Sequence, residues 1–228
     1  MSYSKLTNKY LPTPQHSGRR TNKVEGITVH CMAGNLSIES CSACFQPPRE
    51  ASSNYGIGSD GRIGCYVDEE NRAWTSSSAW NDNRRITIEV ANTSASEPWP
   101  ISDKAYASLV ALCADICKRY NIVPAYDGTI NASFTEHRMF AATACPGTVI
   151  HEHLTSGKLI KDIKNKMTGQ EASDMAITAK DLERVALSVW GYKNKKLEKG
   201  DAYQILRDIR NDVADIKKRV TAIEAKIQ

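Results

Sequence analysis

Three residues of types that can bind a metal constrain the fold of this chain most, because one of them lies more than a hundred positions from the other two. His30 ends the apolar run at residues 26–29, whereas His137 and Cys145 lie together in T-E-H-R-M-F-A-A-T-A-C-P-G. Two imidazoles and one thiolate are donors that zinc prefers, and three protein ligands leave a fourth position open, as in catalytic zinc sites. A histidine that follows a strand is, taken alone, more often a packing residue. A zinc site therefore requires a fold that brings residue 30 to residues 137 and 145.

Most of the chain before residue 168 predicts alternating strands and helices. Residues 26–30 form a short buried strand, and residues 54–57 and 62–67 flank the turn S-D-G, which indicates a hairpin. Residues 86–91 alternate apolar and polar side chains, as in a central strand with one face lining a site. A helix is expected from about Ser102 to Tyr120. The predicted fold class is α/β, with a mixed central β-sheet flanked by helices.

Glu89 is the candidate proton carrier. It lies in the middle of the predicted strand 86–91, on the face opposite to Ile86, Ile88 and Val90. If that face forms the metal cleft, the carboxylate could move protons between water and a leaving amine. A solvent-facing glutamate on an edge strand is an equal alternative from position alone.

Four ordered motifs resemble those of a known family. They are I-T-V-H-C-M-A-G, S-S-N-Y-G-I-G-S-D-G-R-I, R-R-I-T-I-E-V-A-N and T-E-H-R-M-F-A-A-T-A-C-P-G. This set is similar to the zinc-dependent N-acetylmuramoyl-L-alanine amidases of the type 2 family, which includes many phage endolysins and shares its fold with peptidoglycan recognition proteins. The resemblance covers about residues 22–167. It implies one Zn²⁺ per chain, held by His30, His137 and Cys145, and bacterial peptidoglycan as the substrate.

The resemblance also implies roles within the site. Relatives with I-x-I-E use this glutamate catalytically, so Glu89 would handle protons while zinc-activated water attacks the amide between the lactyl group of N-acetylmuramic acid and L-alanine. Thr143 stands where several relatives have a Lys or Thr that helps hold the oxyanion; a hydroxyl donates one hydrogen bond but lacks the charge of lysine. Ser53 occupies a position where some relatives use a tyrosine, so that role does not carry over.

Four further residues are candidate substrate contacts. Asn54 and Tyr55 belong to the second motif, and burial in the sheet is their equal alternative. Trp74 and Trp80 lie in the polar segment R-A-W-T-S-S-S-A-W-N-D-N. Aromatic rings in such a loop could form a wall of the substrate groove or anchor the loop to the core.

The cysteines indicate free thiols. Their number is seven, and an odd number without a signal peptide argues against a disulfide framework. The pairs Cys41/Cys44 and Cys113/Cys117 fall at helical spacing, so both pairs are predicted to be core residues rather than redox or metal sites.

Charge and hydropathy exclude some partners. The formal net charge of +4 is not concentrated in any segment, which argues against nucleic-acid binding. No apolar run approaches the length needed to insert into a membrane. The N-terminus lacks the apolar core of a signal peptide, so we expect synthesis in a bacterial cytoplasm and action on the wall after release, through a holin pore if the gene is phage-encoded.

The organisation expected for the chain is a catalytic domain at 1–167, a linker at 168–177 and a helical module at 178–228. The last part contains a heptad seam, which predicts a parallel coiled coil and a homo-oligomer, with β-branched residues favouring three or four strands. The alternative is that this helix packs against residues 178–190 as a small wall-binding module. The seam consists of Leu206, Ile209, Val213, Ile216, Val220, Ile223 and Ile227.

Several functions remain open from the residues. The favoured one is a lytic amidase, most simply a phage or prophage endolysin, and a cytoplasmic amidase that recycles muropeptides is the alternative within the same chemistry. A non-catalytic peptidoglycan-binding module would be expected to lack a zinc ligand. A thiol hydrolase would use Cys145 as nucleophile and His137 as base, and its activity would survive a chelator.

Overall fold

The computed structural model describes residues 2–169, so the predicted helical module, its heptad seam and nearly all of the predicted linker lie outside the described residues. The strands are β1 (Lys9–Tyr10), β2 (His16–Arg19), β3 (Gly26–Cys31), β4 (Tyr55–Ile57), β5 (Ile63–Cys65), β6 (Asn71–Ala73), β7 (Arg85–Val90) and β8 (Phe134–Glu136). The helices are α1 (Ile38–Cys44), α2 (Ala79–Arg84), α3 (Asp103–Tyr120), the 3₁₀ turn η1 (His137–Met139), α4 (Thr148–Thr155) and α5 (Lys158–Thr168).

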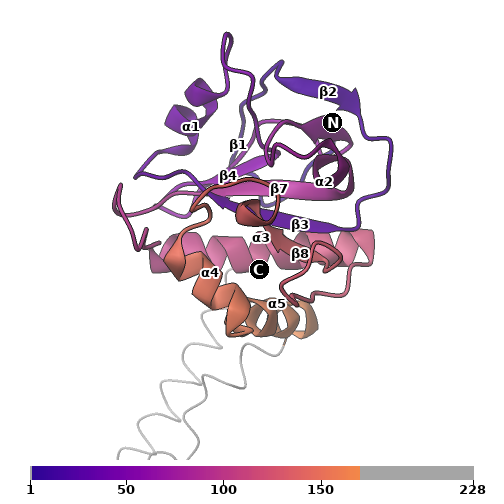
Figure 1. Cartoon of the computed structure of the whole chain (residues 1–228), viewed down its shortest axis with the longest axis vertical. Coiled ribbons are helices and arrows are strands. Elements are labelled where there is room, and N and C mark those ends of the chain that lie inside the picture. Colours follow the sequence, from indigo (N-terminus) through magenta and orange to yellow (C-terminus); the bar gives the residue numbers. More distant parts are fainter. Residues whose placement is uncertain (1, 170–228) are drawn as a thin grey trace, which may run out of the picture. The chain divides into compact units, whose positions relative to one another are not determined.

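The main sheet has the strand order β1-β5-β4-β7-β3-β8 (Figure 1). Strands β4, β7, β3 and β8 run parallel to one another, while β4 and β5 form the antiparallel hairpin predicted around the S-D-G turn. Strands β2 and β6 form a separate antiparallel pair. Central parallel strands are covered on both faces, and all six residues of β3 are buried. The mixed sheet predicted from the sequence is confirmed.

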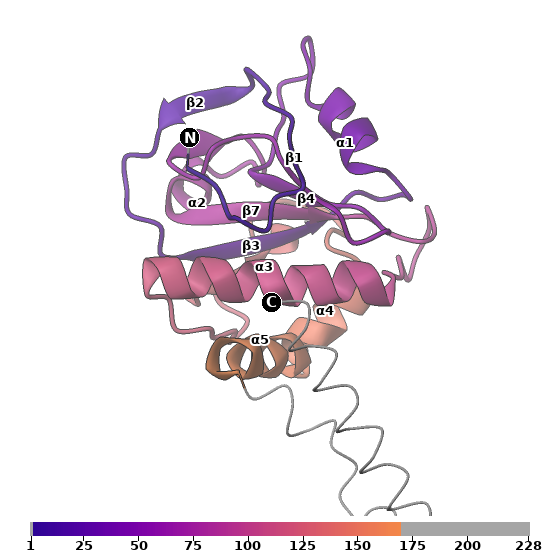
Figure 2. The same cartoon turned by 180° about the vertical axis from the view of Figure 1, so that it is seen from behind.

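One face of the sheet packs against α3. Both views show α3 running along the sheet, with α5 on its outer side (Figures 1 and 2). Apolar side chains of β3 and β7 meet those of α3 in one buried core, and burial of each such side chain contributes about 1.5–3 kcal/mol. Ser102 accepts a hydrogen bond from the Ala105 N–H at the start of α3, and Asn121 ends the helix in the left-handed conformation. The core side chains include Ile27, Val29, Ile86, Ile88, Leu109, Leu112 and Ile116.

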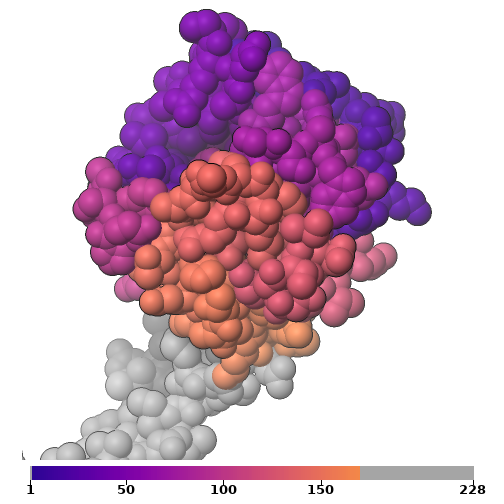
Figure 3. Space-filling model, viewed as in Figure 1, coloured from indigo at the N-terminus to yellow at the C-terminus, as the bar shows by residue number. Residues whose placement is uncertain are grey.

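The opposite face of the sheet carries polar side chains and lies beneath α1, α2 and connecting loops (Figure 1). Strand alternation directs Thr28, His30, Thr87 and Glu89 to this face, because their neighbours in β3 and β7 fill the α3 core. In the space-filling view the segments around residues 135–160 lie beside the N-terminal part of the chain, so the surface joins residues distant in sequence (Figure 3). Within residues 2–169, no helix combines the length and the apolar character that crossing a membrane requires.

The cysteine pairs differ from each other. Cys113 and Cys117 are fully buried in α3, as predicted. In α1 Cys41 is buried, but Cys44 is exposed, so the prediction that both belong to the core is wrong for Cys44. The apolar stripe of this short helix runs through Ile38, Cys41 and Phe45. At 3.6 residues per turn, residue 44 lies roughly a quarter of a turn from that stripe.

Candidate active site

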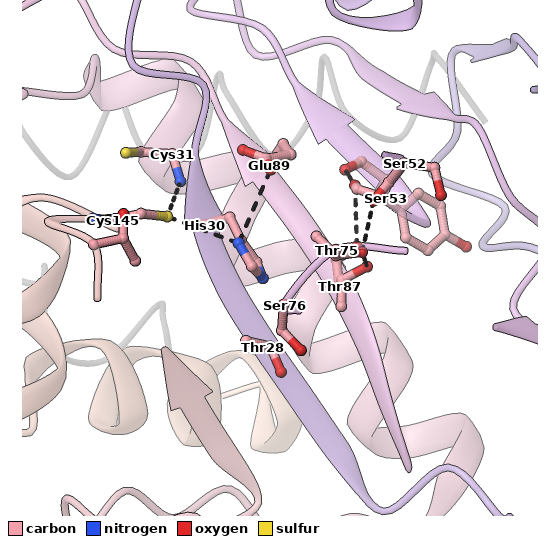
Figure 4. A network of polar contacts seen from close by, with 12 residues as sticks. Thr28, His30, Cys31, Ser52, Ser53, Thr75, Ser76, Thr87, Glu89 and Cys145 are labelled. Carbon is pink, nitrogen blue, oxygen red and sulfur yellow. Dashed lines mark hydrogen bonds and ion pairs between the residues drawn. The ribbon is translucent and has the colours of Figure 1, made fainter. Parts of the chain in front are cut away.

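His30 and Glu89 face each other across two neighbouring strands (Figure 4). They are register partners on the parallel strands β3 and β7, so alternation directs both side chains to the same face. The imidazole is fully buried and the carboxylate is 15% exposed, and Oε1 of Glu89 lies 4.0 Å from Nδ1 of His30. The strand pairing itself therefore fixes the distance between the predicted ligand and the predicted proton carrier.

His137 and Cys145 reach the same place from the other side of β3. Strand β8 pairs Glu136 with Val29, so His137 follows directly beside His30, with ring centroids 4.6 Å apart. The Cys145 thiol accepts a hydrogen bond from the Cys31 N–H at 3.3 Å and lies 3.7 Å from Nδ1 of His30. One donor atom from each of the three predicted ligands lies within 4.8 Å of the others. The structure thus brings together residues separated by more than a hundred positions.

The donor set fits zinc. Bond lengths of about 2.0–2.1 Å to nitrogen and 2.3 Å to sulfur place tetrahedral ligand atoms about 3.4–3.6 Å apart, close to the observed 3.7 Å between Cys145 Sγ and His30 Nδ1. Nε2 of His137 is buried without a hydrogen-bond partner among the described residues. Burial lowers the pKa of both imidazoles, His30 most strongly, so each is neutral near pH 7 and offers a lone pair.

The pKa values of Cys145 and Glu89 are both raised above their usual ranges. Contact with the Cys31 thiol and burial raise the pKa of Cys145, so a metal would have to displace the thiol proton. Burial raises the pKa of Glu89 well above its usual range, the neighbouring Cys31 adds to this shift, and Arg49 opposes it. Oε2 of Glu89 is also buried without a hydrogen-bond partner among residues 2–169. A raised pKa and an unpaired oxygen are properties expected of a group that accepts and releases a proton.

Glu89, His137 and Cys145 line a cavity of about 320 Å³, and the fully buried His30 is not among its lining residues. Its walls are mostly apolar, and Trp74 lies among them as predicted for a groove wall. Thr143 is exposed at the cavity and accepts a hydrogen bond from the Cys145 N–H at 3.2 Å, which leaves its own hydroxyl proton available to a ligand. The apolar lining includes Met32, Leu36, Phe45, Trp74 and Trp99.

Three predicted substrate contacts lie elsewhere. Asn54 and Tyr55 are completely buried, which is the alternative that the sequence left open. The Asn54 amide binds Arg20 and the backbone of residues 67–68, and the Tyr55 hydroxyl donates to Glu69 at 2.5 Å. Trp80 is 42% exposed on α2, stacks under Arg84, and is not among the residues that line the cavity. Neither buried side chain can reach a ligand.

Two cavity residues escaped prediction. Arg49 is exposed and, within the described part of the chain, its guanidinium makes no hydrogen bond or ion pair. Trp99 adopts a left-handed conformation with φ 48°, and Asn92 donates a hydrogen bond to its carbonyl at 2.9 Å. A side-chain carbon on Gly147 would lie only 2.9 Å from the Trp99 ring, so the glycine of the C-P-G motif makes room for this tryptophan. Gly147 is the one feature of the sequence that could have indicated a bulky side chain packed at this position.

One protein family and several solved structures match this chain. The family described as N-acetylmuramoyl-L-alanine amidase matches residues 20–148. The Staphylococcus aureus hydrolase AmiA in complex with its ligand has a TM-score of 0.57 and 17% identity, covering 75% of this chain and 87% of that chain. A mutant of PlyL has a TM-score of 0.54 and 16% identity over 68% of this chain and 97% of its own. A mutant endolysin from Bacillus subtilis has a TM-score of 0.52 and 16% identity, with coverages of 69% and 99%.

The structural likenesses, at such low identity, establish the fold. No curated protein sequence shows a significant match. The family assignment rests on the sequence match at residues 20–148, which spans more than half of the 228 residues. The matched segment contains every residue of the proposed metal site and Glu89 beside it. This chain therefore belongs to the N-acetylmuramoyl-L-alanine amidase family and is a peptidoglycan amidase.

Proposed function

We propose that this amidase is zinc-dependent and that it acts as a phage or prophage endolysin, cutting the amide between the lactyl group of N-acetylmuramic acid and L-alanine of the stem peptide. The observation that carries the zinc proposal is the convergence of two imidazoles and one thiol, with donor atoms within 4.8 Å of one another, beside the unpaired carboxylate oxygen of Glu89. A structural zinc site would have a fourth protein ligand. Within residues 2–169 the cluster contains three.

His30, His137 and Cys145 are the residues that would hold the ion. Zinc bound there supplies a Lewis acid that polarises the scissile carbonyl and makes a water molecule acidic near neutral pH. Both imidazoles are already neutral because burial lowers the pKa of each, so only the Cys145 thiol has to lose a proton when the ion binds. Metal affinity should therefore increase with pH.

Glu89 would carry the proton between the two halves of the reaction. Hydrolysis of an amide takes one proton from water and delivers one to the departing amine, so a single carboxylate can first accept and then donate it. Its raised pKa makes the protonated form accessible near neutral pH, while a nearby cation would lower this pKa again. The position opposite His30 on a rigid strand keeps the carboxylate close to the reacting atoms.

Other side chains of the cavity would orient the substrate. The Thr143 hydroxyl can donate one hydrogen bond to the carbonyl oxygen as negative charge develops on it. Trp74 and Trp99 offer apolar surfaces for the sugar ring or the peptide. The Arg49 guanidinium can pair with a carboxylate of the stem peptide, because it lines the cavity and makes no hydrogen bond or ion pair with an acidic side chain among the described residues.

The metal requirement is tested on a soluble muramoyl peptide. We expect a chelator to abolish release of the peptide and added Zn²⁺ to restore it. The competing thiol hydrolase, with Cys145 as nucleophile and His137 as base, would keep its activity in the chelator. Activity of metal-free protein would therefore contradict the zinc proposal, while loss and recovery with Zn²⁺ would support it.

The lytic role is supported by the likeness to endolysins, one of them from Bacillus subtilis. Release of the protein from the cytoplasm through a holin pore is part of this proposal. Expression in a host bacterium with and without a co-expressed holin tests it: we expect the culture to clear only when the holin is present. A recycling amidase would leave the wall intact in both cultures and would cut only soluble muropeptides.

A further inference from the structure

Arg138, in the 3₁₀ turn η1 next to His137, is hydrogen-bonded to the loop that carries Cys145. Its backbone N–H donates to the carbonyl of Cys145 at 3.1 Å, and Nη2 of its guanidinium donates to the carbonyl of Ala144 at 2.6 Å. One residue thus closes the loop between two of the predicted metal ligands. The guanidinium bond is charge-assisted, which makes it stronger than a neutral hydrogen bond.

The Glu136 carboxylate forms an ion pair with the Arg138 guanidinium. This carboxylate is 2% exposed and lies 3.5 Å from Nε of Arg138. The same carboxylate accepts a hydrogen bond from the Tyr126 hydroxyl at 2.7 Å and lies 2.9 Å from Nδ1 of His151. Three partners from different elements therefore fix this acid. Because Glu136 belongs to β8, which pairs with β3 beside His30, these contacts link the Cys145 loop, through Arg138 and Glu136, to the sheet that carries His30.

The other contacts of this loop are mostly local. Residues 142–144 are exposed and have the small side chains of A-T-A, so they bury little apolar surface. Besides the bonds of Arg138, the loop has the local bonds from the Ala141 N–H to the His137 carbonyl, from the Cys145 N–H to Thr143 and from the Gly147 N–H to the Ala144 carbonyl. The Cys145 thiol also contacts the Cys31 N–H on β3. A loop held this weakly would populate many conformations without a further restraint, and ordering it on metal binding would cost conformational entropy.

We propose that Arg138 is a positioning residue for the metal centre, keeping the Cys145 thiolate within reach of His30 and His137 before the ion arrives. This inference rests on the proposed function, because it assumes that Cys145 is a metal ligand. Loss of an outer partner of a ligand typically costs about 10- to 100-fold in metal affinity. Arg138→Gln should therefore weaken Zn²⁺ binding by about that factor.

The test measures Zn²⁺ affinity of the full chain by competition with a chromophoric chelator, and Cys145 ligation by the thiolate-to-metal absorption of the Co²⁺-loaded protein. Arg138→Gln should bind Zn²⁺ more weakly and show a reduced charge-transfer band. The Zn²⁺ affinity of Arg138→Lys should lie between those of the unaltered protein and of Arg138→Gln. An ammonium group keeps the positive charge but lacks the planar guanidinium, whose separate nitrogens face Glu136 and the Ala144 carbonyl. Arg62→Gln is the matched control, since this half-buried arginine between β4 and β5 also binds acidic side chains, Glu39 and Asp60, but is not among the residues that line the cavity.

The outcomes are distinguishable. Weaker Zn²⁺ binding by Arg138→Gln, with partial recovery in Arg138→Lys and no change in Arg62→Gln, would support the inference. Equal affinities and equal Co²⁺ spectra for Arg138→Gln and the unaltered protein would overturn it. If Arg138→Gln does not fold, a Lys variant that matches the unaltered protein in both measurements would overturn it too. Absence of a Co²⁺–thiolate band in the unaltered protein would instead contradict the proposed zinc site.

Discussion

The carboxylate of Glu89 lies 4.0 Å from Nδ1 of His30 because the two residues are register partners on adjacent parallel strands. Strands in the middle of a sheet are among the least mobile parts of a protein, so this distance does not depend on a loop. His137 and Cys145 approach from the segment after β8, where loop contacts decide the geometry. The site therefore combines a rigid half with a half that has to be held in position.

Glu89→Gln should abolish proton transfer without removing the metal. Glutamine has nearly the same shape but cannot accept and release a proton in this range, so we expect kcat to fall about 10²- to 10⁴-fold. Bound zinc per chain should stay unchanged, because the glutamate is not one of the three clustered donors. Glu70→Gln, at an exposed position outside the cavity, is the control. A glutamine variant with full kcat would show that another group moves the proton.

Arg49→Gln should weaken substrate binding more than it slows the chemical step. A hydrogen bond to a charged group contributes about 1.5–3 kcal/mol, so KM for a muramoyl peptide with a free carboxylate should increase about 10- to 150-fold. The same substitution should have little effect on a substrate in which that carboxylate is amidated. Steady-state kinetics on the two substrates measure this difference. An equal rise in KM for both would mean that the guanidinium does not bind the carboxylate.

The sequence predicted the rigid half of the site better than its surroundings. The predicted strands at 26–30 and 86–91 are confirmed by β3 and β7, because their apolar residues recur with the period of a strand and fill the core against α3. Strands β1, β2, β6 and β8 escaped prediction because two to four residues are too few to show the alternation of a strand. The three candidate ligands were found because the motifs that contain them resemble those of the amidase family, whereas a histidine taken alone is more often a packing residue.

The surroundings depend on partners that are distant in sequence. Asn54 and Tyr55 are buried because Arg20 and Glu69, on other segments, satisfy their polar groups. Sequence alone does not show which polar side chains have such partners. Arg49 and Trp99 lie on irregular segments, where the path of the chain decides whether a side chain enters the cavity. Their roles required the three-dimensional structure.

Arg119→Met should destabilise the fold. Its guanidinium contacts the fully buried carboxylate of Glu69 at 2.5 and 2.6 Å, and Tyr55 and Tyr120 bind the same carboxylate. Removing one partner of a buried pair costs about 3–5 kcal/mol, and we expect the lower end because the Arg119 side chain is 34% exposed.

Urea denaturation measures the effect, and Arg62→Met is the control. Arg62 pairs with acids at the surface, where solvent screens such contacts, so its loss should change the free energy of unfolding little. If the two variants lose the same free energy of unfolding, the Glu69 cluster does not stabilise the fold as expected.

The predicted coiled coil at Leu206 to Ile227, which lies outside the described residues, should determine the oligomeric state. Light scattering should give the full chain the mass of a trimer or tetramer, since β-branched residues at both seam positions favour more than two strands. Ile216→Asp, or a chain ending at Met167, should reduce the mass to that of a monomer. Equal monomeric masses for all three proteins would remove the oligomerisation claim and favour a module that packs within its own chain.

The most direct test of the central claim is analysis of the ends produced when the protein digests purified bacterial cell wall, with chelator and after Zn²⁺ is restored. Mass spectrometry of the products should find new N-terminal alanine, no new reducing sugar ends, and no cleavage in the chelator. New reducing sugar ends, or N-terminal alanine that appears equally in the chelator, would contradict a zinc-dependent amidase.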